Sequence, residues 1–337
     1  MLKRILLLCL SCITLSAMAQ DPQFTQFYAN PLYLNPAFAG SARCPRLSLN
    51  YRNQWPSLSR AYITESASYD QHFDAINGGV GLLILNDKAG DGALSKTSIS
   101  GMYAYQLNIN RKFSMRFGLQ ASYIQEKLDW DKLTFGDEID PRYGFVYPTQ
   151  EQRPTVSKSF PDFSAGVLAY SSKVYGGVAV NHLTEPDEAF IVVGSSKLPM
   201  KITAHLGALL PLSGGYSGYR GTIDRDEGTY ISPNILYQQQ GSFNQINLGI
   251  YMLRSPIIGG LWYRGNFGKG KGNFFSSDSF IALIGLQKGI FKFGYSYDVT
   301  VSKLSNASGG SHELSLGLQF ECRPKKKRFR AISCPSF

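Results

Sequence analysis

The feature that most constrains the fold is an alternation of apolar and polar residues that recurs in many short segments. In "SMRFGLQASYI" (114–124) every second residue is apolar or small and would share one face: Met115, Phe117, Leu119, Ala121 and Tyr123. The same period recurs in "KITAHLGALL", "NQINLGIYM", "FKFGYSYDVTVS" and "HELSLGLQF". A period of two indicates β-strands with one apolar face. No stretch after residue 19 offers the roughly 18 consecutive apolar residues of a membrane helix, so a membrane crossing would have to use strands.

Composition favours strands in a membrane over strands in water. The chain is 13% aromatic and only 17% charged, whereas an average soluble domain carries about 25% charged residues. In a bilayer every backbone amide needs an internal partner, so such strands would have to close into a barrel. A soluble propeller or sandwich also alternates and is the alternative. The sequence therefore predicts an all-β fold, a transmembrane antiparallel β-barrel over residues 47–320.

The segments that fit this pattern number about 14, an even number as in bacterial outer-membrane barrels. They lie near residues 47–55, 59–71, 77–87, 94–107, 113–126, 160–172, 174–184, 199–212, 229–240, 243–254, 257–267, 278–288, 290–302 and 312–320. The long gaps follow the fifth, seventh, eleventh and thirteenth segments, and the shortest turns follow even-numbered ones. This asymmetry predicts long loops outside and short turns in the periplasm. Residues 213–228 would break it as a long periplasmic turn.

Residues 1–19 have the form of a secretory signal. Lys3 and Arg4 precede an apolar run, and Ala17-Met18-Ala19 has the small residues of a cleavage site. Lipidation at Cys9 or Cys12 is not expected. We expect the mature chain to be exported and to begin at Gln20.

The segment 20–46 contains "QDPQFTQFYANPLYLNPAFAG", which is rich in aromatic residues and holds two Asn-Pro pairs. Asparagine before proline is typical of a helix start, in which the asparagine side chain caps the helix and proline takes the first helical position. We therefore expect two short helical turns, capped by Asn30 and Asn35, the second ending at Gly40. The segment would lie at the periplasmic mouth or plug the lumen; the alternative is an irregular leader. Its candidate residues are Phe24, Phe27, Tyr28, Asn30, Pro31, Tyr33, Asn35, Pro36 and Phe38.

The positive charge of the chain is concentrated at its C-terminus. Of the formal net charge of +10, residues 321–337 contribute +5, from six Lys or Arg and one Glu. Such a tail binds nucleic acid, anionic lipid or an acidic protein surface, and export argues against nucleic acid. We expect a periplasmic tail that docks to a partner protein through Lys325, Lys326, Lys327, Arg328 and Arg330.

The other reactive residues predict a disulfide and no active site. Export permits a bridge among Cys44, Cys322 and Cys334: a Cys44–Cys322 bridge would join the two ends of the barrel, and a Cys322–Cys334 bridge would close a loop in the tail. Among the four histidines only His205 would face the lumen as a possible base, and no nucleophile accompanies it. We expect no catalytic, cofactor or metal site, and therefore no enzyme.

Four blocks occur in order along the chain: "QDPQFTQFYANPLYLNPAFAGS", "NDKAGDGALS", "GYSYDVTVSKLSNASGGSHELSLGLQF" and "CRPKKKRFRAISCPSF". Together they make the chain resemble the PorP/SprF family of outer-membrane proteins of the Bacteroidetes type IX secretion system. The resemblance implies a non-enzymatic role in secretion and gliding motility, in which the protein helps export or anchor a large surface adhesin. Its implied partners are the adhesin's C-terminal domain, a periplasmic ring lipoprotein, a peptidoglycan-binding protein and outer-membrane lipid.

The rival prediction is an outer-membrane porin or hydrophobic-ligand transporter with the N-terminal segment as a hatch. The polar strand faces would suit a wet lumen in that case. The basic tail speaks against it, because a solute channel does not need one.

Overall fold

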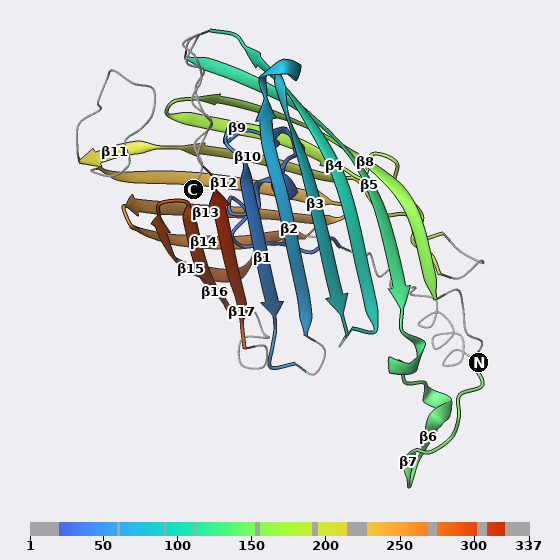
Figure 1. Cartoon of the computed structure of the whole chain (residues 1–337). Helices are drawn as coiled ribbons and strands as arrows, with labels where there is room; N and C mark the ends of the chain where they lie inside the picture. The colour runs from blue at the N-terminus through green and yellow to red at the C-terminus, as the bar shows by residue number, and fades with distance from the viewer. Residues whose placement is uncertain are drawn as a thin grey trace, which may run out of the picture.

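The strands of the chain form a closed antiparallel β-barrel of 14 strands (Figure 1). The computed structural model describes residues 20–58, 61–90, 92–110, 112–151, 156–190, 195–213, 228–268, 275–301 and 309–320. Successive wall strands pair with each other, and pairing of β1 with β17 and of β10 with β12 closes the ring.

The wall strands are β1 (Arg46–Gln54), β2 (Tyr62–Phe73), β3 (Gly78–Ala89), β4 (Leu94–Asn108), β5 (Phe113–Leu128), β8 (Ser157–Ser171), β9 (Val174–Asn181), β10 (Lys201–Ala208), β11 (Leu210–Ser213), β12 (Thr229–Gln240), β13 (Phe243–Arg254), β14 (Ile257–Gly268), β15 (Phe275–Lys288), β16 (Phe291–Thr300) and β17 (Ser311–Gln319). β10 and β11 both pair with β12 and are separated only by Leu209, so together they form one strand of the wall.

The predicted barrel of 14 strands is confirmed, with shifted ends at several strands. β8 begins at Ser157 rather than 160, and β15 begins at Phe275 rather than 278. These added residues include Ser157, Ser159, Ser276 and Ser277, which give no alternation because both of their faces are polar. Backbone pairing continues past the end of the sequence signal.

The two faces of the wall differ as the alternation predicts. On β5, Leu119 is 65% exposed on the outer surface, whereas Arg116 is fully buried on the lumen side. On β1, Ser48, Asn50 and Arg52 are all buried on the lumen side. An apolar outside and a polar inside are the arrangement of an outer-membrane barrel.

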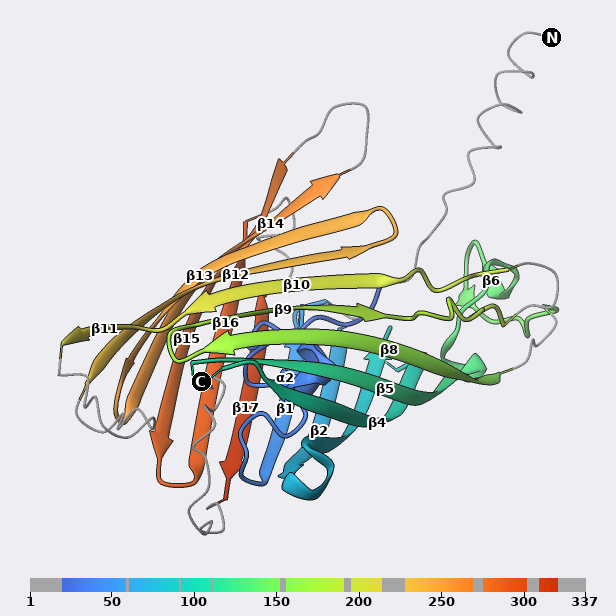
Figure 2. The same ribbon diagram turned by 90° about the horizontal axis from the view of Figure 1, so that it is seen from above.

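The two rims of the barrel are unequal. On one rim, called the turn side here, the fully described connections are short, such as the η2 turn (Asp74–Ile76) between β2 and β3 and residues 172–173 between β8 and β9. On the other, the loop side, residues 129–156 carry the turns η3 (Trp130–Lys132) and η4 (Gly136–Glu138) and the hairpin β6 (Ile139–Asp140) to β7 (Gly144–Phe145). This loop projects far beyond the strand ends (Figures 1 and 2). Residues 214–227 lie outside the described part, so the predicted turn at 213–228 is not described.

The N-terminal segment lies within the ring of strands, as Figure 2 shows for α2 (Pro31–Leu34). A second turn, η1 (Pro36–Phe38), follows it. The two predicted helical turns are present. Asn35 caps η1 by accepting a hydrogen bond from the Ala37 amide, but the prediction that Asn30 caps α2 is wrong. Asn30 is fully buried against β2, and its side-chain amide instead donates to Ser66 Oγ on the wall (2.8 Å).

No helix in the described ranges is long and apolar enough to cross a membrane.

Candidate functional site in the barrel lumen

Residues 20–43, called the strap here, cross the lumen from the loop side to the turn side. Gln20 to Gln23 border the same chamber as Gln54, the last residue of β1, and Tyr62, the first residue of β2. The chain then descends through the lumen and enters β1 at Arg46, on the opposite rim. All nine residues singled out from the sequence lie on the strap, and all except Tyr33 are buried.

A buried cluster of charges holds the strap at Thr25. Arg52 and Arg264 both contact Asp298 Oδ2 (3.1 and 3.0 Å), and Arg52 also contacts Glu313 Oε2 (3.2 Å). The cluster joins β1, β14, β16 and β17. Two cations face two carboxylates, so the cluster is neutral as a whole, and the side chains of its members are at most 7% exposed.

The strap supplies the missing partners of this cluster. Glu313 accepts hydrogen bonds from the backbone amides of Thr25 (2.6 Å) and Gln26 (2.9 Å). The Thr25 hydroxyl donates to Asp298 Oδ2 (2.7 Å) and accepts from Arg264 (3.0 Å). Buried charges need such partners, and leaving one unpaired costs about 3–5 kcal/mol. The charged groups of the wall are therefore arranged to hold this part of the strap.

Another arginine of the wall holds the strap near the turn side. Arg116 donates to the backbone carbonyls of Ala37 (3.1 Å), Ala39 and Gly40 (3.3 Å). Gly40 has φ +69°, a left-handed conformation that glycine adopts without strain, and its amide donates to Asp70 (2.7 Å). The guanidinium thus donates to the carbonyls of Ala37 and Ala39, and it gives the Gly40 carbonyl a second donor beside the Arg43 backbone amide (3.2 Å).

An ionic contact fixes the start of the strap at the loop side. Asp21 Oδ2 lies 2.7 Å from His182 Nε2 and 3.6 Å from Lys201 Nζ, and His182 Nδ1 lies 3.0 Å from Asp162 Oδ2. Both ring nitrogens of His182 face carboxylates, so both must donate, which requires the cationic imidazolium. Burial of His182 lowers its pKa, but Asp21 and Asp162 outweigh burial and raise the pKa to about 9.

Glycines in the wall make room for the strap backbone. A Cβ on Gly118 would lie 2.3 Å from the Ala37 amide nitrogen, one on Gly79 2.3 Å from the Ala39 carbonyl oxygen, and one on Gly166 2.1 Å from Asn35 Oδ1. Real Cβ atoms do not approach other atoms this closely. The wall of β3, β5 and β8 therefore fits the strap only because it lacks side chains at these positions.

The aromatic residues of the strap pack against one another, as in Phe24 with Tyr33 (5.2 Å between ring centroids) and Phe27 with Tyr28 (4.7 Å), and also against the wall. The Phe27 ring meets Trp262 edge-on (4.7 Å between centroids), and Phe38 stacks on His205 (5.4 Å). The strap is extended because its hydrogen-bond partners are spread along the lumen. His205, the predicted possible base, is buried beneath Phe38, with no hydrogen-bond partner at either ring nitrogen.

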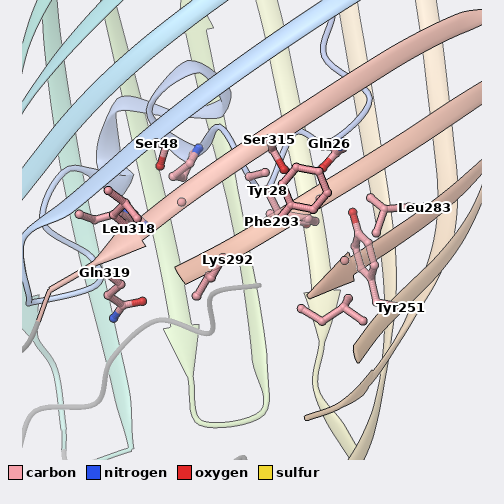
Figure 3. A pocket seen from close by; sticks show the side chains of 17 residues that line it. Gln26, Tyr28, Ser48, Tyr251, Leu283, Lys292, Phe293, Ser315, Leu318 and Gln319 are labelled. Carbon is pink, nitrogen blue, oxygen red and sulfur yellow. The ribbon is translucent and has the colours of Figure 1, made fainter. Parts of the chain in front are cut away.

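Several cavities remain beside the strap. A small one of about 70 Å³ lies between Tyr28 and the apolar residues Tyr251, Leu283 and Phe293 of the wall (Figure 3). A larger chamber of about 750 Å³ lies on the loop side. Among its lining residues, carboxylates outnumber cations six to three: Asp21, Asp87, Glu126, Glu188, Asp278 and Asp298 against Arg52, Lys96 and Arg264.

The remaining predicted sites are only partly within the described residues. Cys44 is disulfide-bonded, and its partner lies outside the described part of the chain. The tail residues Lys325, Lys326, Lys327, Arg328 and Arg330 and the cysteines Cys322 and Cys334 also lie outside it. Within the described ranges, no group of three or more His, Cys, Asp or Glu side chains is placed to hold a metal ion.

Residues 16–318 match the model of the family described as "Type IX secretion system membrane protein PorP/SprF". The chain belongs to the PorP/SprF family. No curated protein matches it. Family membership and the closed barrel together place this PorP/SprF protein in the outer membrane as a component of the type IX secretion system.

Solved structures with similar folds are outer-membrane barrels. The CymD monoaromatic hydrocarbon channel is 11% identical, with 88% of this chain and 94% of that chain covered and a TM-score of 0.43. The toluene transporter TbuX of Ralstonia pickettii is 11% identical (86% and 93% covered, TM-score 0.41), and Omp33 of Acinetobacter baumannii is 8% identical (83% and 100% covered, TM-score 0.41). Scores this low do not distinguish one kind of outer-membrane barrel from another.

The residues on the wall that hold the strap were not singled out from the sequence of this PorP/SprF protein. Two signals point to them. Charged residues on the lumen face of membrane strands, such as Arg52 and Glu313, need buried partners. Glycine inside a strand, as at Gly118, often marks a site where another backbone approaches closely.

Proposed function

We propose that this protein is a sealed component of the type IX secretion system that helps export or anchor a large surface adhesin and links it to periplasmic partners. Family membership supplies the secretion system. The observation that carries the proposal further is the strap: it occupies the lumen over its whole height and is held by Glu313, Arg116 and His182 at three levels. A lumen filled in this way suits a docking protein better than an open pore.

The sealing role is tested by single-channel conductance in planar bilayers. The wild-type barrel is expected to conduct poorly, and deletion of residues 21–40 is expected to open a stable large conductance. A deletion variant that folds, as shown by its heat-modifiable mobility in gels, but conducts no better than wild type would refute the seal.

The loop side is the part of the protein that we assign to the secreted partner. The loop 129–156 projects furthest and carries exposed aromatic residues, with Tyr143 71% and Phe145 61% exposed. Its hairpin is rigidified from within, because Asp140 accepts hydrogen bonds from the amides of Arg142 (2.7 Å) and Tyr143 (2.9 Å). Exposed aromatic residues on a preorganised support are typical of binding surfaces.

Exchange of residues 129–156 for the equivalent loop of another family member tests this assignment. The exchange is expected to change which adhesin is exported or retained at the surface. Unchanged adhesin choice, with normal amounts of folded barrel in the membrane, would move specificity to another loop.

The basic tail is the part that we assign to a periplasmic partner, the ring lipoprotein or the peptidoglycan-binding protein of the system. Its charge favours an acidic protein surface by electrostatic complementarity. Affinity purification from native membranes in mild detergent, followed by mass spectrometry, is expected to recover these partners with the full-length chain. Loss of residues 325–337 is expected to abolish their recovery, and unchanged recovery would refute the assignment.

The transporter alternative keeps one supporting observation, the apolar cavity between Tyr28 and the wall (Figure 3). In that case the strap would serve as a hatch, and purification would recover the barrel alone, reproducibly and without secretion-system proteins.

A further inference from the structure

The direction of the strap has a topological consequence. The strap begins at the loop side, at Gln20, and ends at the turn side, where Arg46 opens β1. In outer-membrane barrels the long loops face the outside of the cell and the short turns face the periplasm. The first residues of the strap therefore lie on the side of the membrane away from the periplasm.

The signal sequence read in residues 1–19 directly precedes this end. A signal that is still attached holds residue 20 at the inner membrane, on the periplasmic side. The strap cannot then reach the loop-side chamber, because the chain would have to return through a lumen that the strap itself fills. Its passage is tight: Asn35 is fully buried and contacts carbonyls of β8 and β9, and Gly118 has no room for one methyl group beside Ala37.

We infer that the strap seats only after the signal has been removed, and that the new N-terminus is delivered through the lumen to the outer chamber, which residues 20–23 line. Wall residues at the loop side hold the new N-terminus once it arrives. The Asp21 side chain contacts His182 and Lys201, and the Asp21 backbone amide donates to Gln240 Oε1 (3.0 Å). Removal of the signal thereby couples maturation to closure of the barrel. This inference rests on the proposed orientation and on the proposed signal.

Thiol labelling on intact cells tests the inference. The reagent is a polyethylene glycol maleimide that is too large to pass porins but is thin enough for its reactive end to enter a chamber. Gln20→Cys is the test position, Tyr143→Cys the loop-side control and Ser172→Cys the turn-side control. Cys322 and Cys334 are outside the described residues, so labelling of the wild-type chain is subtracted in every case.

We expect Gln20→Cys and Tyr143→Cys to be labelled on intact cells to the same extent as after permeabilisation, and Ser172→Cys only after permeabilisation. If Tyr143→Cys fails to label on intact cells, the orientation and the proposed function fail. If Tyr143→Cys labels and Gln20→Cys does not, the orientation stands and this inference is overturned.

A second variant tests the order of events. Ala17→Leu combined with Ala19→Leu removes the small residues that cleavage requires. In the Gln20→Cys background, the uncleaved chain is expected to lose all labelling on intact cells, whether or not the barrel assembles. A chain that retains residues 1–19, as shown by mass spectrometry, yet is labelled from outside would overturn the inference.

Discussion

One added methyl group on the inner wall should be enough to disturb the strap. In Gly118→Ala, the new Cβ would lie 2.3 Å from the Ala37 nitrogen and 2.5 Å from the Pro36 carbonyl carbon. Ordinary contact begins near 3.4 Å, so the strap has to move by about 1 Å, and overpacking of this kind costs about 1–3 kcal/mol. The movement also pulls Ala37 from Arg116, and a hydrogen bond to a charged group contributes about 1.5–3 kcal/mol.

The chain offers a matched control on the neighbouring strand. Gly101, on β4, has no atom within 4 Å of the position that a Cβ would take. Gly101→Ala makes the same chemical change without contact to the strap and is expected to be neutral or to stabilise the barrel by up to about 1 kcal/mol through reduced chain entropy.

Two assays read the difference. Gly118→Ala is expected to lower the temperature at which the folded barrel loses its heat-modifiable mobility and to add conducting events in planar bilayers, and Gly101→Ala is expected to do neither. Equal behaviour of the two variants in both assays would show that the strap yields freely at Ala37, and the account of a tightly fitted lumen would be wrong.

The remaining predictions concern the charges that hold the strap. Glu313→Gln leaves two buried arginines with one carboxylate and is expected to destabilise the folded barrel by about 3–5 kcal/mol in denaturant titrations. The control Glu65→Gln breaks an exposed pair with Lys88 and should cost less than about 1 kcal/mol. Similar losses of unfolding free energy in the two variants would refute the role of burial. The pKa of His182 is raised above its ordinary value of 6.5 to about 9, so its stabilising contribution is complete below pH 6.5 and is lost as pH rises through about 9. A spin label at Gln20 is therefore expected to gain mobility through that upper range, and in His182→Gln it should be mobile at all pH values; a label that is equally mobile at pH 7 and 10 in the wild-type chain would contradict this.

The wall of the barrel could be predicted in detail because its signal is local. In β5, each residue from Met115 to Tyr123 faces lipid or lumen according to its place in a period of two, and the environment on each side selects its chemistry. Strand number, the long loop after β5 and the two helical turns of the strap follow from such neighbouring residues. The extended ends, as at Ser157, could not be predicted because polar residues suit both faces above the membrane.

The contacts of the strap could not be predicted, because they join residues that are far apart in the chain. Thr25 lies 288 positions before Glu313, its hydrogen-bond partner, and Asp21 lies 161 positions before His182. A single sequence shows that Glu313 and Arg52 are unusual residues on membrane strands. It does not show which residues are their hydrogen-bond and ion-pair partners. Asn30 illustrates the same limit: its local sequence predicts a helix cap, and burial against Ser66 overrides it.

The sequence by itself therefore determined that this chain crosses a membrane with about 14 strands and belongs with the type IX secretion proteins, because alternation and ordered motifs are properties of neighbouring residues. Only the tertiary structure decided what fills the barrel and in which direction it runs. Closure of the ring brings β1, β14, β16 and β17 around a single lumen, and only then do Arg52, Arg264, Asp298 and Glu313 become one cluster with Thr25 at its centre.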